Sequence, residues 1–439
     1  MAYTAPQALI SLEEKIKTKK LKAGVIGLGY VGLPLAVEFA KEGIQVYGID
    51  IDQRKVSNIQ KGISYIQDVP SDTVKNLLSG KKLNATSDFS IIRELDTVNI
   101  CVPTPLGKSK DPDISYIVAA AEEIVRYLHE GMLIILESTT YPGTTEEVIL
   151  PMLEKTGLKV GKDFYLAFSP ERVDPGNSKY NTRNIPKVVG GVTQKCTELA
   201  QSFYKIAIER VDAVSSPRAA EMVKLLENTF RSVNIGLVNE LCQMSEKLGV
   251  NVWEIIDAAA TKPFGFMPFY PGPGLGGHCI PIDPHYLAWK ARIHGFNPRF
   301  IDLAGEVNSS MPEFVVQKAQ AALNERKKAL NGSKILILGI AYKKNVSDYR
   351  ESPALEIIEL LEKNGADIAY SDPFVPEFSF LDKIRKSTQL ESLRSNFDLV
   401  ILITDHDHFD PQSLLNQFPL ILDTRNAFRG IQSEKVIRI

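Results

Sequence analysis

Short apolar runs alternate with helically spaced apolar positions through about the first 210 residues of the chain. The runs at 23–27, 45–50, 97–102 and 132–137 are rich in Val, Ile and Leu, and patterns typical of helices fill the intervals between them. Strands that alternate with helices indicate βαβ units around a parallel sheet. We therefore predict a Rossmann-like α/β domain over residues 1–212.

One long helix is predicted to follow this domain. Ser216 and Pro217 form a favourable helix start, with serine as the N-cap and proline at the first helical position. Apolar residues then recur at helical spacing as far as Leu248, and Gly249 supplies a stop signal. A helix of just over 30 residues is about 48 Å long. It suits the joining of two domains or the pairing of two subunits, and we assign it to a central helical domain over 213–325.

A second α/β pattern occupies the C-terminal part of the chain. The apolar runs at 333–338, 366–370, 399–403 and 420–422 indicate strands, and a helical pattern lies between the first two. We expect a second Rossmann-like domain over 326–439. The predicted fold class is α/β, with two Rossmann-like domains bridged by a central helical domain that contains one long helix.

Composition and charge narrow the class of protein. The chain has 439 residues, of which 44% are hydrophobic and 24% charged, which is typical of globular proteins. The 51 basic and 53 acidic residues give a net charge of −2, which argues against a general nucleic-acid binder. Neither a membrane span nor a secretion signal is evident. The four cysteines, at 101, 196, 242 and 279, form no CxxC pair, so we expect a cytoplasmic protein without a disulfide framework.

A glycine-rich turn follows the first predicted strand and opens a helix. Gly27, Gly29 and Gly32 allow a tight turn and let backbone N–H groups approach a pyrophosphate. Asp50 ends the next predicted strand, where a carboxylate binds both ribose hydroxyls and repels the extra phosphate of NADP. This combination favours NAD as the cofactor; the alternative is a glycine turn of some other α/β protein.

Cys279 lies in a second glycine-rich stretch, residues 271–285, which lets the backbone wrap closely around a ligand. Asp283 and Pro284 are predicted to be the cap and the first residue of a helix. The thiol would then lie just ahead of a helix N-terminus, where the dipole favours a thiolate. The alternative is a small residue in a tight loop, and helix capping alone would explain Asp283.

Lys224 and Asn228 are four residues apart on the predicted long helix and therefore share a face. Apolar neighbours suggest that Lys224 is half-buried, where it could stabilise an oxyanion or hold a water. The alternative is an ordinary solvated lysine on a helix surface.

Several motifs together resemble the UDP-glucose/UDP-N-acetylmannosamine dehydrogenase family. They are GLGYVGLP at 27–34, CVPTP at 101–105, ESTTYPGTT at 137–145, SPER at 169–172, EMVKLLENT at 221–229, GPGLGGHCIPIDP at 272–284 and GIAYKKNVSDYRESPA at 339–354. The resemblance covers nearly the whole chain, and the family oxidises the carbon 6 alcohol of a nucleotide sugar to a carboxylate. The chain is most similar to the branch acting on N-acetylated sugars, in particular the UDP-N-acetylglucosamine 6-dehydrogenases of surface-polysaccharide pathways.

The resemblance also implies roles for individual residues. Cys279 would be the nucleophile. The other residues implied at the reacting centre are Lys224, Asn228, Asp283, Thr139 and Glu171. The residues implied at NAD are Gly27, Gly29, Tyr30, Val31, Gly32, Asp50, Thr104 and Arg350. The residues implied at the substrate are Arg172, Lys224, Asn228, Arg299, Tyr270, Gly276 and Lys343, with Arg425 as a weaker candidate. In the family the position of Arg299 can reach the substrate site of a neighbouring subunit, so a homodimer or higher homo-oligomer is implied.

The chemistry implied by the resemblance has two oxidation steps. Conversion of an alcohol to a carboxylate removes four electrons and therefore uses two NAD+ per sugar. Attack of Cys279 on the aldehyde gives a thiohemiacetal that can lose a second hydride to form a thioester. Water then hydrolyses the thioester, with Glu171 a reasonable base and Lys224 a stabiliser of the oxyanion. Asp283 and Asn228 could orient the water, and Tyr270 could line the sugar cavity or simply support the glycine loop.

Two departures from the glucose branch leave the sugar open. Residue 282 is Ile where that branch usually has Lys, and Pro175 replaces a second glutamate, with Asp174 one position earlier. UDP-N-acetylglucosamine is therefore preferred, with UDP-N-acetylmannosamine, UDP-N-acetylgalactosamine and UDP-glucose as alternatives. Two further hypotheses remain. One, from another functional class, is a regulator that binds a nucleotide sugar without catalysis, and the other is a related dehydrogenase that removes only two electrons.

A cluster of acids and histidines at 404–410 is the remaining candidate for chemistry. It follows a predicted strand, and no second cluster supplies further ligands. We therefore expect a polar loop at the strand end and no metal site.

Overall fold

The computed structural model of the chain describes residues 11–105, 112–174, 177, 179–277, 279–381, 383–390 and 396–439. The chain divides into two compact units, Met1–Glu227 and Asn228–Ile439, and each has a sheet and core clusters of its own. No helix within the described residues is long and apolar enough to cross a membrane.

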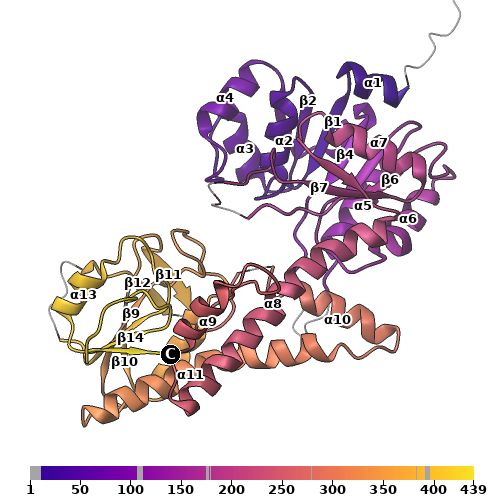
Figure 1. The fold of residues 1–439 in the computed structure, drawn as a ribbon. Helices are drawn as coiled ribbons and strands as arrows, with labels where there is room; N and C mark the ends of the chain where they lie inside the picture. The colour runs from indigo at the N-terminus through magenta and orange to yellow at the C-terminus, as the bar shows by residue number, and fades with distance from the viewer. Residues whose placement is uncertain are drawn as a thin grey trace, which may run out of the picture. The chain divides into compact units, whose positions relative to one another are not determined.

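The first unit contains an eight-stranded sheet with the order β3-β2-β1-β4-β5-β6-β7-β8 (Figure 1). The strands are β1 (Lys22–Ile26), β2 (Gln45–Ile49), β3 (Leu83–Thr86), β4 (Thr97–Ile100), β5 (Leu133–Leu136), β6 (Tyr165–Phe168), β7 (Lys187–Gly191) and β8 (Val211–Ala213). Neighbours from β3 to β6 are parallel, as predicted, which confirms the Rossmann-like fold. Neither β6 nor β7 was predicted from the sequence, and β7 departs from the parallel pattern because it is antiparallel to β6. Parallel neighbours need a long crossover, usually a helix, and the described residues between these two strands form none.

Helices cover both faces of this sheet. They are α1 (Leu12–Thr18), α2 (Gly32–Lys41), α3 (Gln53–Gln60), α4 (Ser71–Ser79), α5 (Ser115–Tyr127), α6 (Leu150–Glu154) and α7 (Gln194–Tyr204), with a 3-10 helix at Phe89–Glu94 and a π-helical turn at Thr145–Ile149. Successive strand residues point to opposite faces, so Val25 packs in one core cluster and Ile26 in the other. Burial on both faces explains why the strands are nearly continuous apolar runs.

The long helix α8 (Pro217–Leu248) begins and ends where the sequence predicted (Figure 1). The Ser216 hydroxyl accepts the N–H of Ala219 at 3.1 Å, and Pro217 is the first helical residue. At the other end Gly249 has a φ of +69°, the left-handed conformation that closes many helices. These local signals account for both ends of α8.

The second unit combines a helical layer with a smaller, fully parallel sheet. Its helices are α9 (Val252–Ala260), α10 (Asp283–Ile293), α11 (Arg299–Glu325), α12 (Pro353–Lys363) and α13 (Pro411–Gln417). The sheet has the order β10-β9-β13-β14-β15, and its strands are β9 (Lys334–Leu338), β10 (Asp367–Ser371), β13 (Leu399–Leu402), β14 (Ile421–Asp423) and β15 (Val436–Arg438). A hairpin of β11 (Glu377–Phe380) and β12 (Lys383–Lys386) is separate. This confirms a second Rossmann-like domain together with a helical region.

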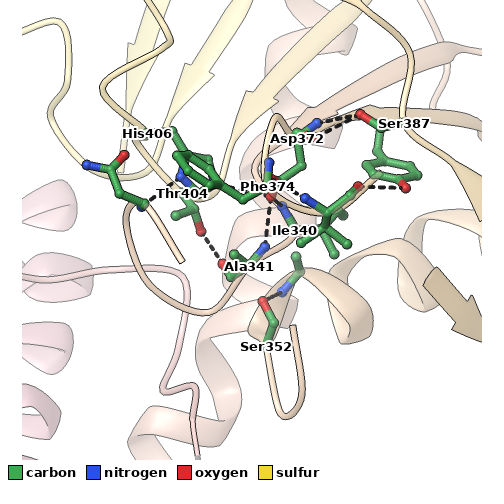
Figure 2. Close-up of polar contacts among 12 residues, drawn as sticks. Ile340, Ala341, Ser352, Asp372, Phe374, Ser387, Thr404 and His406 are labelled. Carbon is green, nitrogen blue, oxygen red and sulfur yellow. Dashed lines mark hydrogen bonds and ion pairs between the residues drawn. The ribbon is translucent and has the colours of Figure 1, made fainter. Parts of the chain in front are cut away.

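The first turn of the second sheet is held by a buried carboxylate. Gly339, directly after β9, has a φ of +82°, and a Cβ there would lie 2.4 Å from the carbonyl oxygen of Thr404. Asp372, directly after β10, accepts the N–H groups of Ile340 and Ala341 at 2.7 and 3.0 Å on one oxygen. Figure 2 shows the carboxylate between these donors and His406. The turn can therefore be made only by a glycine, and it is fixed by one acidic side chain.

His406 is buried, whereas the sequence predicted only a polar loop after β13. Its Nε2 lies 3.1 Å from Asp372 Oδ2, and its Nδ1 accepts the N–H of Asn345 at 2.9 Å. Burial would raise the pKa of Asp372, but His406 and the backbone donors outweigh it and lower that pKa. The histidine therefore anchors the loop after β9 to the end of β10. Within the described residues, no group of three or more His, Cys, Asp or Glu is placed to hold a metal.

Replacement of Gly339 by Ala should destabilise the second unit more than replacement of Gly332 by Ala. Both glycines have nearly the same φ, +82° and +83°, but a Cβ at Gly332 meets nothing within 4 Å. The left-handed conformation costs about 1–2 kcal/mol in either variant, and the clash at Gly339 adds roughly 1–3 kcal/mol. Urea denaturation of the two variants measures the difference. Equal losses would show that the contact with Thr404 relaxes without penalty.

Candidate active site

The glycine turn of the first unit is tight at two positions and open at the third. Gly27 has a φ of +94°, and a Cβ there would lie 2.5 Å from the carbonyl oxygen of Cys101. A Cβ at Gly32, the first residue of α2, would lie 1.9 Å from the carbonyl oxygen of Gly27. A Cβ at Gly29 would meet nothing within 4 Å. The fold thus requires the first and last glycines, while the middle one faces open space suited to a close ligand.

Asp50 directly follows β2 and is 6% exposed. One of its oxygens accepts the N–H of Leu28 at 2.8 Å and contacts Lys55 Nζ at 3.1 Å, and the other accepts the N–H of Asp52 at 2.8 Å. Since a carboxylate has about four acceptor positions, the one left is on the oxygen that binds Asp52. This geometry suits the ribose contact expected of Asp50. Strand order reverses between β1 and β4, which is where open α/β sheets bind ligands.

The other residues expected at the cofactor surround this turn or lie in the second unit. Tyr30 is 52% exposed, Val31 immediately precedes α2, and Thr104 is half-buried in the segment after β4. Arg350 belongs to the second unit, where its guanidinium forms a two-pronged ion pair with Asp348 at 2.9 and 2.7 Å.

Glu171 lies in the segment after β6 and is 8% exposed. Phe168 of β6 pairs with Gly190 of β7, and continuing this antiparallel register by three residues puts Glu171 opposite Lys187. Lys187 Nζ contacts Glu171 at 3.3 Å and Glu137, which follows β5, at 2.7 Å. The reversed strand therefore brings a buried lysine to two buried carboxylates, an arrangement that the sequence analysis missed. The sequence contained one signal of this arrangement, a lysine at the start of the apolar run KVVGG at 187–191.

Thr139 and Lys224 meet within the first unit. Lys224 Nζ donates to Thr139 Oγ1 at 2.5 Å, and Lys224 is half-buried. Glu221, one turn earlier on α8, accepts the N–H groups of Gly143 and Thr145 at 2.5 and 2.9 Å. Two residues of α8 thus hold the 139–145 loop, and Lys224 is more than a solvated helix charge.

Arg172 is half-buried, and each of its three guanidinium nitrogens donates a hydrogen bond within the first unit. Its Nη2 and Nε donate to Glu227 at 2.6 and 3.2 Å, and its Nη1 donates to the carbonyl oxygen of Pro186 at 2.6 Å. These bonds use three of the five N–H donors of the guanidinium, so one N–H on each Nη is left for a substrate contact. Pro175 lies outside the described residues.

Asp283 and Asn228 form a buried pair in the second unit. Asn228 Nδ2 donates to Asp283 Oδ2 at 2.6 Å, and the two residues are 8% and 2% exposed. The expectation that Asp283 caps its helix is wrong. Ile282 is the N-cap and Asp283 is the first residue of α10, because the backbone turns into the helix one residue earlier. Capping therefore no longer accounts for a buried carboxylate at this position.

Cys279 is the exposed member of the four cysteines. Its carbonyl oxygen accepts the N–H of Asp283 at 2.8 Å, so it lies one turn before α10, as predicted. Burial raises the pKa of the Cys101 thiol well above its ordinary value and that of Cys242 to about 12. Both of these thiols stay protonated at neutral pH, whereas Cys279 is accessible at the surface of its unit. His278 lies outside the described residues.

Glycines before Cys279 allow its loop to pack against the loop after β9. A Cβ at Gly276 would lie 2.8 Å from Tyr342 Cβ, and a Cβ at Gly277 would lie 2.8 Å from Cε2 of the Tyr342 ring. Gly272 donates its N–H to Asn239 Oδ1 at 3.0 Å, and a Cβ there would meet the guanidinium of Arg425 at 2.6 Å. Gly276 is thus required by close packing within the unit.

The remaining substrate candidates also lie in the second unit. Tyr270 stacks on Trp253 with ring centroids 5.9 Å apart and donates its hydroxyl to Asp257 at 2.9 Å, which favours support of the loop over lining of a cavity. Arg299 is the exposed first residue of α11, and Lys343 is half-buried in the loop after β9.

Comparison with known proteins matches the chain along most of its length. Three family models fit in succession: the NAD binding domain of the UDP-glucose/GDP-mannose dehydrogenase family at 21–208, its central domain at 218–310 and its UDP binding domain at 336–430. The chain belongs to the UDP-glucose/GDP-mannose dehydrogenase family. It is an NAD-dependent nucleotide-sugar dehydrogenase, which confirms the resemblance, the cofactor and the class of reaction inferred from the sequence.

The similar proteins are named for two different sugar substrates. The chain is 35% identical over 393 residues to a UDP-N-acetyl-D-glucosamine 6-dehydrogenase of Pseudomonas aeruginosa, covering 89% of this chain and 92% of that one. It is 36% identical over 393 residues to a UDP-N-acetyl-D-mannosamine dehydrogenase of Methanococcus maripaludis, covering 88% and 87%. The solved UDP-D-ManNAc dehydrogenase of Pyrococcus horikoshii superposes with a TM-score of 0.88 at 34% identity, covering 95% and 99%. Identity alone does not separate the two sugars.

Replacement of Asp50 by Ser should weaken NAD binding by this dehydrogenase. Hydrogen bonds to a charged group contribute about 1.5–3 kcal/mol, so KM for NAD+ should rise roughly 10- to 100-fold, and discrimination against NADP+ should fall. Asp52→Ser is a matched control, because Asp52 caps α3 and serine can do the same. Initial rates at varied NAD+ and NADP+ measure both effects. An unchanged KM in Asp50→Ser would exclude the ribose contact.

Proposed function

We propose that this dehydrogenase oxidises carbon 6 of UDP-N-acetylglucosamine to the uronic acid, using two NAD+ per sugar and Cys279 as nucleophile. The observation that carries the proposal is the exposed Cys279 in a glycine loop one turn before α10, within a nucleotide-sugar dehydrogenase family. A helix N-terminus favours the thiolate, which is the nucleophilic form. An oxidation that stopped at the aldehyde would not need such a residue.

The residues of the glycine turn, with Asp50, would hold the cofactor in the first unit. NAD+ held there would supply the hydride acceptor for each of the two oxidations. The first oxidation also releases the alcohol proton. Lys224, with Thr139 beside it, stabilises the negative charge that develops on the substrate oxygen.

The thiolate of Cys279 then adds to the aldehyde carbon, and the resulting oxyanion is held by Lys224. Loss of the second hydride converts this thiohemiacetal into a thioester without breaking the carbon–sulfur bond. Water attacks the thioester carbon, Glu171 takes the water proton, and the thiolate leaves as the carboxylic acid forms. The buried pair of Asn228 and Asp283 orients the water. The alcohol and one water together give the carboxylate, two hydrides and three protons, the third proton coming from ionisation of the carboxylic acid.

The nucleotide half of the substrate is assigned to the second unit, with Lys343 as a contact, while Arg299 and the backbone at Gly276 are further substrate contacts and Tyr270 supports the glycine loop. The match of the UDP binding domain to residues 336–430 supports this assignment. Arg172 contributes a substrate contact from the first unit, and Arg350 is assigned to the cofactor.

UDP-N-acetylglucosamine is preferred over the other sugars, and a role in surface-polysaccharide precursor synthesis follows from that choice. The name of the Pseudomonas aeruginosa relative supports the preference. The Methanococcus maripaludis relative supports UDP-N-acetylmannosamine as the second candidate. The two sugars are epimers at carbon 2, so a few contacts in the pocket decide between them.

A cytoplasmic homodimer formed through α8 completes the proposal. Phe230, Leu237, Met244 and Leu248 are between 46% and 68% exposed and recur at intervals of seven, seven and four residues along the helix. Such spacing forms one apolar stripe of the kind that pairs two helices.

Limiting UDP-N-acetylglucosamine should yield two NADH per sugar, because alcohol to carboxylate is a four-electron change. Absorbance of NADH is measured in parallel on this sugar, on its galactose and mannose epimers and on UDP-glucose. The highest kcat/KM is expected with UDP-N-acetylglucosamine. One NADH per sugar would remove Cys279 from the mechanism, and no turnover with any of the four would favour a binding protein.

Replacement of Cys279 by Ser should lower steady-state turnover by at least about 10³-fold. Serine is a weaker nucleophile and its ester hydrolyses less readily than a thioester, so a covalent adduct should accumulate. Intact-protein mass spectrometry detects the adduct. Cys279→Ala is the control, since alanine forms no adduct at all. Normal turnover in the serine variant would refute covalent catalysis.

A further inference from the structure

Lys187 is a buried cation that the reaction scheme above does not use. It is the first residue of β7 and is 4% exposed. Its ammonium lies 2.7 Å from Glu137 Oε2 and 3.3 Å from Glu171 Oε2. Burial disfavours the charged amine, but the two carboxylates outweigh burial and raise the pKa of Lys187. The lysine is therefore charged at neutral pH and faces two acids with one positive charge.

Glu137 is fixed by neutral donors on its other oxygen. Its Oε1 accepts Asn99 Nδ2 at 2.6 Å and the Tyr204 hydroxyl at 2.7 Å. Burial raises the pKa of Tyr204 well above its ordinary value, so that hydroxyl remains a donor. Since Glu137 is held by these two donors and lies nearer to the ammonium of Lys187 than Glu171 does, it keeps the ammonium from moving fully onto Glu171.

Glu171 retains one acceptor position. Its Oε1 accepts the N–H groups of Arg172 and Val173 at 2.8 and 2.7 Å, and its Oε2 accepts Lys187. A carboxylate offers about four such positions, so the one that remains is on Oε2, beside the lysine. Burial would raise the pKa of Glu171, but Lys187 and the two backbone donors outweigh it and lower that pKa.

We propose that Lys187, held by Glu137, is a positioning residue that keeps Glu171 ionised and presents Oε2 to the water that hydrolyses the thioester. The inference rests on the proposed function, in which Glu171 takes the water proton. It assigns no contact between Lys187 and the substrate. Its signature is the pH dependence of one step, thioester hydrolysis, which follows both hydride transfers.

The other charged and titratable groups around Glu171 affect its ionisation less than Lys187 does. Lys224 on α8 also lowers the pKa of Glu171, but its influence is smaller than that of Lys187. The guanidinium of Arg172 is paired with Glu227. Cys101, after β4, and Tyr204, on α7, are uncharged because burial raises the pKa of each. Removal of the Lys187 charge should therefore dominate any change in the ionisation of Glu171.

Replacement of Lys187 by Met tests the proposal. The acidic limb of the kcat profile should move to higher pH by about 1–3 units, the usual effect of losing an adjacent opposite charge. At a pH below the shifted limb, rapid mixing should show a burst of two NADH per active site followed by slow steady-state formation of NADH, because only hydrolysis of the thioester is impaired. Lys187→Arg keeps the charge and should restore the limb. Lys159→Met is the control, since it breaks an exposed pair with Glu154 in the same unit.

An acidic limb at an unchanged pH in Lys187→Met would overturn the proposal. A smaller NADH burst with the limb at an unchanged pH would also overturn it, because that result shows only a loss of folded enzyme. If the single variant fails to fold, Lys187→Met with Glu137→Gln is measured instead, because glutamine can still bind Asn99 and Tyr204 and the substitution removes the buried charge of residue 137. The same two outcomes decide it. Failure of the proposed function is distinguishable, since the unaltered enzyme would then not yield two NADH per sugar.

Discussion

A buried carboxylate at the end of a second strand organises the first turn of both α/β units. Asp50 accepts the N–H that follows Gly27, and Asp372 accepts the N–H that follows Gly339. Each glycine has a positive φ and lies against the backbone that follows the next strand along the sheet. One acidic side chain per unit therefore holds the turn at the carboxyl ends of the parallel strands, which is the edge where such sheets bind ligands. The two units do this although they share no evident sequence repeat.

The same contact has opposite consequences in the two units. In the first unit Asp50 binds a single N–H of the turn, Gly29 faces open space, and α2 begins directly afterwards. In the second unit Asp372 also binds the N–H of Ala341 and the ring of His406, and a long loop replaces the helix. One turn is open to a dinucleotide, whereas the other is filled by the side chains of the protein itself (Figure 2).

Reversal of a single strand creates the charged centre of the first unit. Because β7 is antiparallel to β6, Lys187 at its start lies opposite Glu171 beyond the end of β6. Three ionisable residues are then buried together, and each oxygen of the two acids has a donor. On α8, Glu221 and Lys224 hold the neighbouring 139–145 loop. Backbone topology and one long helix thus place residues that come from four separate segments, at 137–145, 171, 187 and 221–224.

The sequence by itself determined the elements whose causes are local. Glycine turns, the Ser216 cap, the Gly249 stop and the apolar runs predicted the Rossmann-like units, the ends of α8 and the NAD turn, because each depends on residues adjacent in the chain. Only the tertiary structure decided that β7 is reversed, that Asp283 binds Asn228 instead of capping α10, and that Lys187 and His406 are buried beside acids. Those features depend on strand pairing and on burial, which bring together residues between 16 and 55 positions apart.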